Sequence, residues 1–110
     1  MFWITNLINL KKIFISSDHA GFKLKEFIKM YLEKKKYKYF DLGPKTNSKV
    51  DYPDYAHKLC KKVSKISSNI GILVCGSGIG MSMAANRHKK IRAAVCYSLK
   101  NTKLDRKSVV

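Results

Sequence analysis

The sequence has few acidic residues, few arginines and few cysteines, and it has no long apolar run. Only seven of its 110 residues are Asp or Glu, against 23 Lys and Arg, which gives a formal net charge of +16 at pH 7. Charge of this sign makes nucleic acid a partner to consider. Only three of the cations are arginines, however, and the lysines occur in every polar segment. Because phosphate forks and base readout favour clustered arginine, a solvated lysine surface is the favoured interpretation and a nucleic-acid-binding protein the less favoured one.

The scarcity of cysteine excludes two classes of small domain. Cys60, Cys75 and Cys96 are odd in number and form neither a CxxC pair nor a Cys/His pattern with metal-ligand spacing. This excludes a disulfide framework and a structural zinc site. We therefore expect no metal, and we expect a cytoplasmic location. No window approaches the ~20 apolar residues of a membrane-spanning helix, and a soluble domain without membrane contact is predicted.

The length predicts one domain, because about 100 residues can build one hydrophobic core and cannot build two. In residues 1–11 the basic residues follow the apolar ones and no small-residue cleavage site occurs. We therefore interpret residues 1–11 as an N-terminal extension rather than a targeting segment, and we expect a domain at 12–110.

Apolar periodicity along the domain alternates between strand and helix patterns. Strands are predicted at 12–17, 37–43, 70–75 and 91–97, and helices at 22–35, 54–65 and 79–88, with a polar loop at 43–53. The first helix is expected to present one apolar face. That face comprises Phe22, Leu24, Phe27, Ile28, Tyr31 and Leu32. The 70–75 strand, apolar almost throughout, is expected to be buried on both faces. Such alternation predicts a parallel sheet with helices on both sides.

Two turns follow predicted strands and are candidates for a binding site. In parallel sheets ligands bind beyond the carboxyl ends of the strands. The segment "DHAG" follows the first strand and "CGSGIG" follows the third. Asp18, His19 and Cys75 are therefore expected on one rim, provided that their strands are neighbours.

The glycine-rich turn has a GxGxG spacing, formed by Gly76, Gly78 and Gly80. A dinucleotide fingerprint would need its third glycine at Met81, and no Walker lysine-serine pair is present, so nucleotide binding is disfavoured. Turn amides and the positive end of the following helix would suit an oxyanion or a phosphate. The alternative is a tight strand-to-helix turn without a ligand.

Cys75 is the cysteine with the strongest claim to function. Its place just before a helix N-terminus makes a thiolate available as a base or nucleophile, whereas Cys60 and Cys96 are expected to be inert core thiols. His19, beside Asp18, could bind phosphate or transfer a proton, or it could be structural. Two further histidines, His57 and His88, are expected at the surface. Asn86 could cap the third helix or reach the rim.

Four segments in order, "SSDHAGFKLKEFI", "DLG", "DYPDYA" and "CGSGIGMSMAANRHKKIRAAVC", resemble the ribose-5-phosphate isomerase B family, which also contains the galactose-6-phosphate isomerase subunits. The resemblance runs from about residue 12 to about residue 104. It implies a Rossmann-like three-layer α/β/α fold and a homodimer. It also implies interconversion of aldose and ketose phosphates through an enediolate, without a metal or an organic cofactor.

The resemblance also implies roles for individual residues. Cys75 matches the base that moves a proton between the two reacting carbons, and Ser77 matches a catalytic position beside the reacting hydroxyls. Family members without this cysteine carry a glutamate base at the place of Met81. The implied substrate-binding residues are Asp18, His19, Tyr52, Gly76, Gly78, Ile79, Gly80 and Asn86. The amides of residues 76–80 match the group that holds the enediolate oxygen.

The resemblance ends before the family pattern does. Family chains continue with a histidine-asparagine pair, a further strand that ends near an arginine, and a C-terminal helix that brings more phosphate-binding arginines. Here "DRKSVV" follows instead. We therefore expect a C-terminally truncated member in which that strand and helix are missing. A sugar-phosphate isomerase is the first hypothesis, and a non-catalytic remnant of the family is the alternative.

Overall fold

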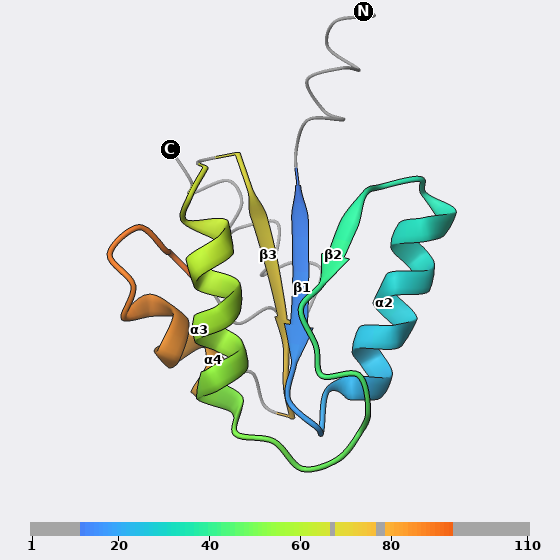
Figure 1. Ribbon diagram of the computed structural model, residues 1–110, viewed down its shortest axis with the longest axis horizontal. Helices are drawn as coiled ribbons and strands as arrows, with labels where there is room; N and C mark the ends of the chain where they lie inside the picture. The colour runs from blue at the N-terminus through green and yellow to red at the C-terminus, as the bar shows by residue number, and fades with distance from the viewer. Residues whose placement is uncertain (1–11, 67, 77–78, 94–110) are drawn as a thin grey trace, which may run out of the picture.

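The structure is a computed structural model that describes residues 12–66, 68–76 and 79–93. Strands and helices alternate in these residues. They are β1 (Ile13–Ser17), α2 (Phe22–Lys34), β2 (Tyr39–Asp41), α3 (Tyr52–Val63), β3 (Ile70–Val74) and α4 (Ile79–Asn86). The strands form a parallel sheet in the order β2-β1-β3, with α2 on one side and α3 and α4 on the other (Figure 1). The predicted α/β fold with a covered parallel sheet is confirmed.

Two predicted segments lie outside the described residues. One is the N-terminal extension at 1–11, and the other is the 91–97 strand from residue 94 onward. Residues 91–93 are described and are neither helix nor strand. No helix in the described ranges is long and apolar enough to span a membrane.

Strand β1 is the centre of the sheet. All five of its residues are buried, and Ile15 has no exposed surface. Phe14 stacks on Phe40 of β2 with ring centroids 5.2 Å apart. Burial of this kind explains why β1 consists of apolar and small residues, since both of its faces are covered by helices.

The prediction that β3 is buried on both faces is wrong. Only Val74 of this strand is buried, and its other residues are half-buried or exposed. In the described part of the chain β3 pairs with β1 alone. Gly71 lies against α3, where an added Cβ would lie 2.6 Å from Leu59 Cδ2. Glycine at this position lets α3 approach the strand closely.

The predicted apolar face of helix α2 is buried only in part. Leu24, Phe27 and Tyr31 are 54%, 66% and 53% exposed. The helix buries Leu32 of that face together with Lys25, which lies outside it. These two residues are seven apart and lie on one face of a helix. The charge of the buried Lys25 is paired, because its ammonium binds a carboxylate at the end of β2.

Helices α3 and α4 pack against each other on the opposite face of the sheet. Their buried residues are Ala56, Leu59, Cys60, Met81, Ala84 and Ala85. Burial raises the pKa of the Cys60 thiol, in agreement with an inert core cysteine. Helix α3 begins two residues before the predicted position 54, because Pro53 is compatible with the first turn of a helix.

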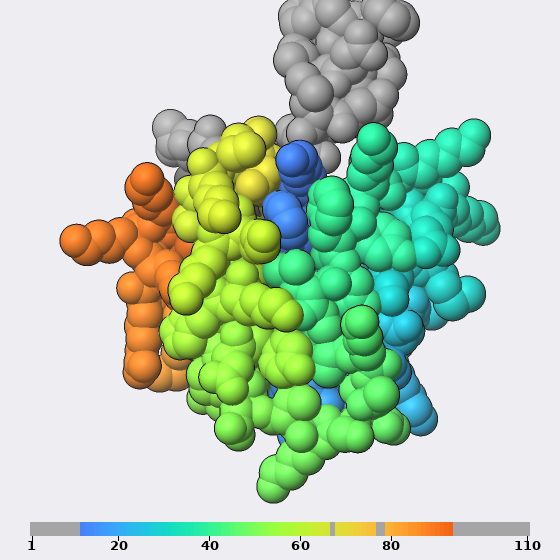
Figure 2. Space-filling view, viewed as in Figure 1, coloured from blue at the N-terminus to red at the C-terminus, as the bar shows by residue number. Residues whose placement is uncertain are grey.

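The outer surface of α3 is rich in lysine. Figure 2 shows α3 (yellow-green) between the segment that follows β2 (green) and α4 (orange). Its exposed lysines are Lys58, Lys61 and Lys62, and the exposed Lys65 follows its end. His57 and His88, predicted at the surface, are half-buried, and His57 Nδ1 lies 2.7 Å from His88 Nε2. This contact joins α3 to the turn that follows α4.

Candidate active site

The register of the sheet brings the ends of β1 and β3 together. Ser17 pairs with Val74, so Asp18 and Cys75 follow adjacent positions on neighbouring strands. The Asp18 N–H donates to the Val74 carbonyl at 3.1 Å. A Cβ added to Gly21 would lie 2.4 Å from the same carbonyl oxygen, so the loop 18–21 packs directly on the end of β3. Since β1 and β3 are neighbours, Asp18, His19 and Cys75 lie on one rim, as the sequence predicts.

Asp18 and His19 are each held by a backbone amide. The Asp18 Oδ1 atom accepts a hydrogen bond from the Gly21 N–H at 2.8 Å. The His19 Nδ1 atom accepts one from the Val50 N–H at 3.3 Å. Because Nδ1 acts as an acceptor here, the proton of a neutral His19 ring lies on Nε2. Both side chains are half-buried, which leaves part of each accessible at the rim.

Cys75 and the glycine turn form the other side of the rim. Cys75 is half-buried and follows β3 directly, and Gly76 after it is exposed. A Cβ added to Gly76 would lie 3.6 Å from the Ala20 Cβ, so the turn lies beside the loop 18–21. Of the predicted site residues, Ser77 and Gly78 lie outside the described part of the chain.

The start of α4 brings a third segment to the site. Ile79, its first residue, is 59% exposed. A Cβ added to Gly80 would lie 2.9 Å from Tyr52 Cζ, so the Tyr52 ring packs on the first turn of α4. Tyr52 is itself 42% exposed at the start of α3. The structure thus joins Tyr52 to the glycine turn, although the two are far apart in the sequence.

Two residues singled out by the sequence analysis lie away from the rim. Met81 is 1% exposed and belongs to the core between α3 and α4. Asn86 is the last residue of α4, and its Oδ1 accepts from the Ala93 N–H at 2.8 Å while its Nδ2 donates to the Ala93 carbonyl at 3.0 Å. These bonds hold the chain that leaves α4, and a substrate contact of Asn86 stays a prediction.

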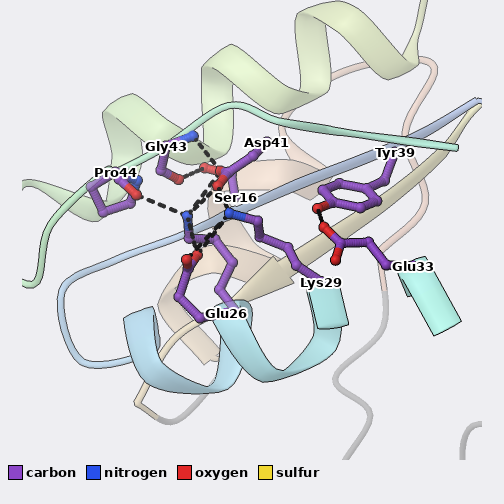
Figure 3. Close-up of polar contacts among 9 residues, drawn as sticks. Ser16, Glu26, Lys29, Glu33, Tyr39, Asp41, Gly43 and Pro44 are labelled. Carbon is purple, nitrogen blue, oxygen red and sulfur yellow. Dashed lines mark hydrogen bonds and ion pairs between the residues drawn. The ribbon is translucent and has the colours of Figure 1, made fainter. Parts of the chain in front are cut away.

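Lys25 and Asp41 support the rim and were not singled out by sequence reasoning. The Lys25 Nζ atom donates to both carboxylate oxygens of Asp41 and to the Pro44 carbonyl, each at 2.8 Å. Asp41 also accepts from Lys29 Nζ and from the Gly43 N–H, both at 2.8 Å (Figure 3). The signals in the sequence were a lysine among the apolar residues of α2 and the "DLG" segment, which begins at the last residue of β2.

Ion pairing shifts the pKa values of this cluster in opposite directions. Burial raises the pKa of Asp41, but hydrogen bonds from Lys25, Lys29 and the Gly43 amide outweigh it and hold the pKa below its usual value. The hydrogen bond to Asp41 is the main cause that raises the pKa of Lys29. Nearby, a hydrogen bond to Glu33 raises the pKa of Tyr39. Both shifts favour the charged forms of Asp41 and Lys29 at neutral pH.

The low pKa of Asp41 predicts an acid-labile part of the stability. A carboxylate whose pKa is lower in the folded chain stabilises the fold above its unfolded pKa of about 3.9. This contribution is lost as the pH falls through the lower folded value. We expect the urea midpoint to fall between about pH 5 and pH 2, and we expect Asp41→Asn to be less stable at pH 7 and to lose part of this pH dependence. Circular dichroism at several pH values measures this.

The matched control for this experiment is Asp54→Asn. Asp54 is exposed in the first turn of α3 and lies outside the cluster. Its replacement should leave most of the acid dependence of the wild-type chain in place. Identical pH profiles for the two variants would contradict the assignment to Asp41.

The chain is similar to sugar-phosphate isomerases over most of its length. The family model that matches it, Ribose/Galactose Isomerase, covers residues 13–109. The ribose-5-phosphate isomerase B of Escherichia coli is 38% identical over 97 residues, which are 88% of this chain and 65% of that protein. The chain spans 60% to 65% of the length of the curated relatives it matches.

Solved structures agree with this similarity. A ribose 5-phosphate isomerase from Thermotoga maritima is 47% identical, with a TM-score of 0.83, over 86% of this chain and 66% of that one. The ribose-5-phosphate isomerase B of Mycoplasma genitalium, solved with bound ribulose-5-phosphate, is 43% identical, with a TM-score of 0.84, over 88% of this chain and 65% of that one. Sequence motifs, sheet order and these similarities lead to one conclusion. The chain belongs to the Ribose/Galactose Isomerase family.

Proposed function

We propose that the rim is the active site of a sugar-phosphate isomerase that interconverts ribose 5-phosphate and ribulose 5-phosphate. The observation that carries this proposal is the pairing of Ser17 with Val74, from which Asp18 and Cys75 follow on neighbouring strands. A candidate base and a candidate pair of sugar-binding side chains thus lie on one rim of the sheet. Membership of the family, and a relative solved with bound ribulose-5-phosphate, support this choice of substrate.

In the proposed reaction Cys75 moves one proton between two carbons. Its thiolate takes the proton from C2 of the open-chain aldose, and the electron pair forms an enediolate with negative charge on O1. The resulting thiol returns the proton to C1, while the proton on O2 passes to O1. The product is the isomeric ketose and the thiolate is restored, so no oxidant, metal or second substrate is needed.

The remaining rim residues are proposed to bind the sugar and the charge that develops on it. Backbone amides of the turn, at Gly76, Gly78, Ile79 and Gly80, would stabilise the enediolate oxygen. Ser77 would lie beside the reacting hydroxyls. Asp18 would bind sugar hydroxyls, and the proton that His19 carries on Nε2 could be donated to the ring oxygen or to the phosphate. Tyr52 would line the rim beside Gly80, because its ring packs on that glycine.

A second subunit is part of the proposal, because the family resemblance implies a homodimer whose active site is shared. The first experiment is therefore conversion of ribose 5-phosphate by the purified chain, measured beside the same chain joined to the C-terminal segment of the Escherichia coli relative. Turnover by the chain supports the proposed function. Turnover by the extended chain alone supports the competing view, a non-catalytic remnant with an intact rim. Folded protein that is inactive in both forms would refute the assignment.

A further inference from the structure

Lys25 is the most unusual buried residue of the described chain. Its side chain has no exposed surface. A lysine ammonium is costly to remove from water unless each of its protons is hydrogen bonded and its charge is paired. The two Asp41 oxygens and the Pro44 carbonyl meet this need. An apolar residue of similar length would take one cation from Asp41, which keeps its bonds to Lys29 and the Gly43 N–H, and would remove the bond between Lys25 and the Pro44 carbonyl.

The partners of Lys25 belong to one short segment, residues 41–44. Within that segment, the Asp41 carboxylate accepts a hydrogen bond from the Gly43 N–H at 2.8 Å. On its other side, the Gly43 carbonyl accepts from Ser16 Oγ at 3.0 Å and from the Ser17 N–H at 3.2 Å. The segment 41–44 is thus fixed both to the last residues of β1 and to the first turn of α2.

The rim loop 18–21 spans these two attachment points. Ser17 immediately precedes the loop, and Lys25 follows it by one helical turn, with the Lys25 N–H donating to the Gly21 carbonyl at 2.9 Å. Both ends of the loop are therefore anchored on residues 41–44. The same segment leads into the chain that carries Val50, whose N–H binds His19 Nδ1.

We propose that Lys25 is a positioning residue for the reaction, which holds Asp18 and His19 in place through residues 41–44. This inference rests on the proposed function. Lys25 has no exposed surface at the rim, because it is fully buried with its ammonium directed to Asp41 and Pro44. Its contribution is to fix the distance between the loop 18–21 and the ends of β1 and β2. Displacement of catalytic groups by about 1 Å can cost about 100-fold in rate, so a clamp of this kind matters for turnover.

The test compares three single substitutions in α2, each of which removes a different interaction. Lys25→Met removes the ammonium that binds both Asp41 and Pro44. Lys29→Met removes a second cation that lies 2.8 Å from Asp41 and has no bond to Pro44. Leu32→Ala removes a buried side chain, 7% exposed, that takes no part in the cluster. Lys29→Met controls for charge near Asp41, and Leu32→Ala controls for lost stability.

The readouts are the tautomer of His19, from long-range 1H–15N NMR spectra, and kcat and KM for ribose 5-phosphate. We expect the wild-type chain, Lys29→Met and Leu32→Ala to keep the Nε2–H tautomer that the Val50 bond selects. Lys25→Met should give a mixture of tautomers and lower kcat by about 10- to 100-fold. Asp41→Asn, which keeps one acceptor oxygen, is a second variant should Lys25→Met not fold, and it should shift the His19 signals in the same direction.

Two results would overturn the inference. One is a Lys25→Met chain with the wild-type His19 tautomer and unchanged kcat, and the other is a Leu32→Ala chain that alters both as strongly. The proposed function fails separately. A wild-type chain, alone and extended, that shows the expected tautomers across the variants but converts no sugar phosphate would refute the isomerase and still support Lys25 as the clamp of the loop.

Discussion

Cys75→Ser is expected to lower conversion of ribose 5-phosphate by about 10²- to 10⁴-fold, the range that a positioned general base contributes. A serine hydroxyl is close to the thiol in size and is not ionised at neutral pH, so it cannot accept the C2 proton. Cys75 is half-buried at the end of β3, and replacement by serine should leave the unfolding transition almost unchanged. Initial rates at saturating substrate, with urea unfolding measured on the same samples, test both statements. These measurements are made on the form of the chain, native or extended, that turns over substrate.

Cys60→Ser is the matched control, since it makes the same chemical change in the core. Cys60 is 1% exposed between α3 and the sheet, where a hydroxyl would be buried. That burial should cost roughly 1–3 kcal/mol of stability, while the folded fraction keeps its rate. Equal loss of rate in the two serine variants would contradict a specific role for Cys75. Full activity in Cys75→Ser would place the base elsewhere on the rim.

The features that sequence predicted correctly depend on local patterns. The strand before Asp18 and the strand before Cys75 each combine a short apolar run with a turn that ends it. Strands separated by helices give a parallel sheet, and only their order had to be supplied by the structure. Once β1 and β3 are neighbours, the position of Cys75 beside Asp18 follows from the register.

The features that sequence missed depend on contacts between distant residues. Helix α2 has an apolar stripe, and its periodicity alone predicts that this stripe packs on the sheet. Part of that stripe stays exposed, and the helix also buries Lys25, which binds an acid 16 positions away. The bond between His19 and Val50 spans 31 positions and involves a backbone amide, for which no side-chain pattern exists. A buried ion pair can therefore share the inner face of a helix with apolar residues, as it does here beside the candidate site.

Gly21→Ala is expected to have the second large effect, on stability and on turnover together. An added Cβ would lie 2.4 Å from the Val74 carbonyl oxygen and 2.6 Å from its carbon. These are backbone atoms of β3 and cannot rotate away as a side chain would. Gly21 has φ −89°, which alanine adopts without strain, so the close approach alone is the cause of the effect. Overpacking of this kind costs about 1–3 kcal/mol, which urea unfolding would measure.

The loss of turnover in Gly21→Ala should exceed what its lower stability explains. To admit the methyl group, the loop 18–21 must move away from β3, which lengthens the 3.1 Å bond between the Asp18 N–H and the Val74 carbonyl. Gly76→Ala is the control for stability, because its Cβ would meet only the Ala20 Cβ at 3.6 Å, an ordinary contact. We expect its unfolding midpoint to stay near that of the wild type. A Gly21→Ala chain that is destabilised yet fully active when folded would show that the distance between the loop and β3 does not govern the reaction. That result would count against an active site shared by the two strand ends and against the positioning role of Lys25.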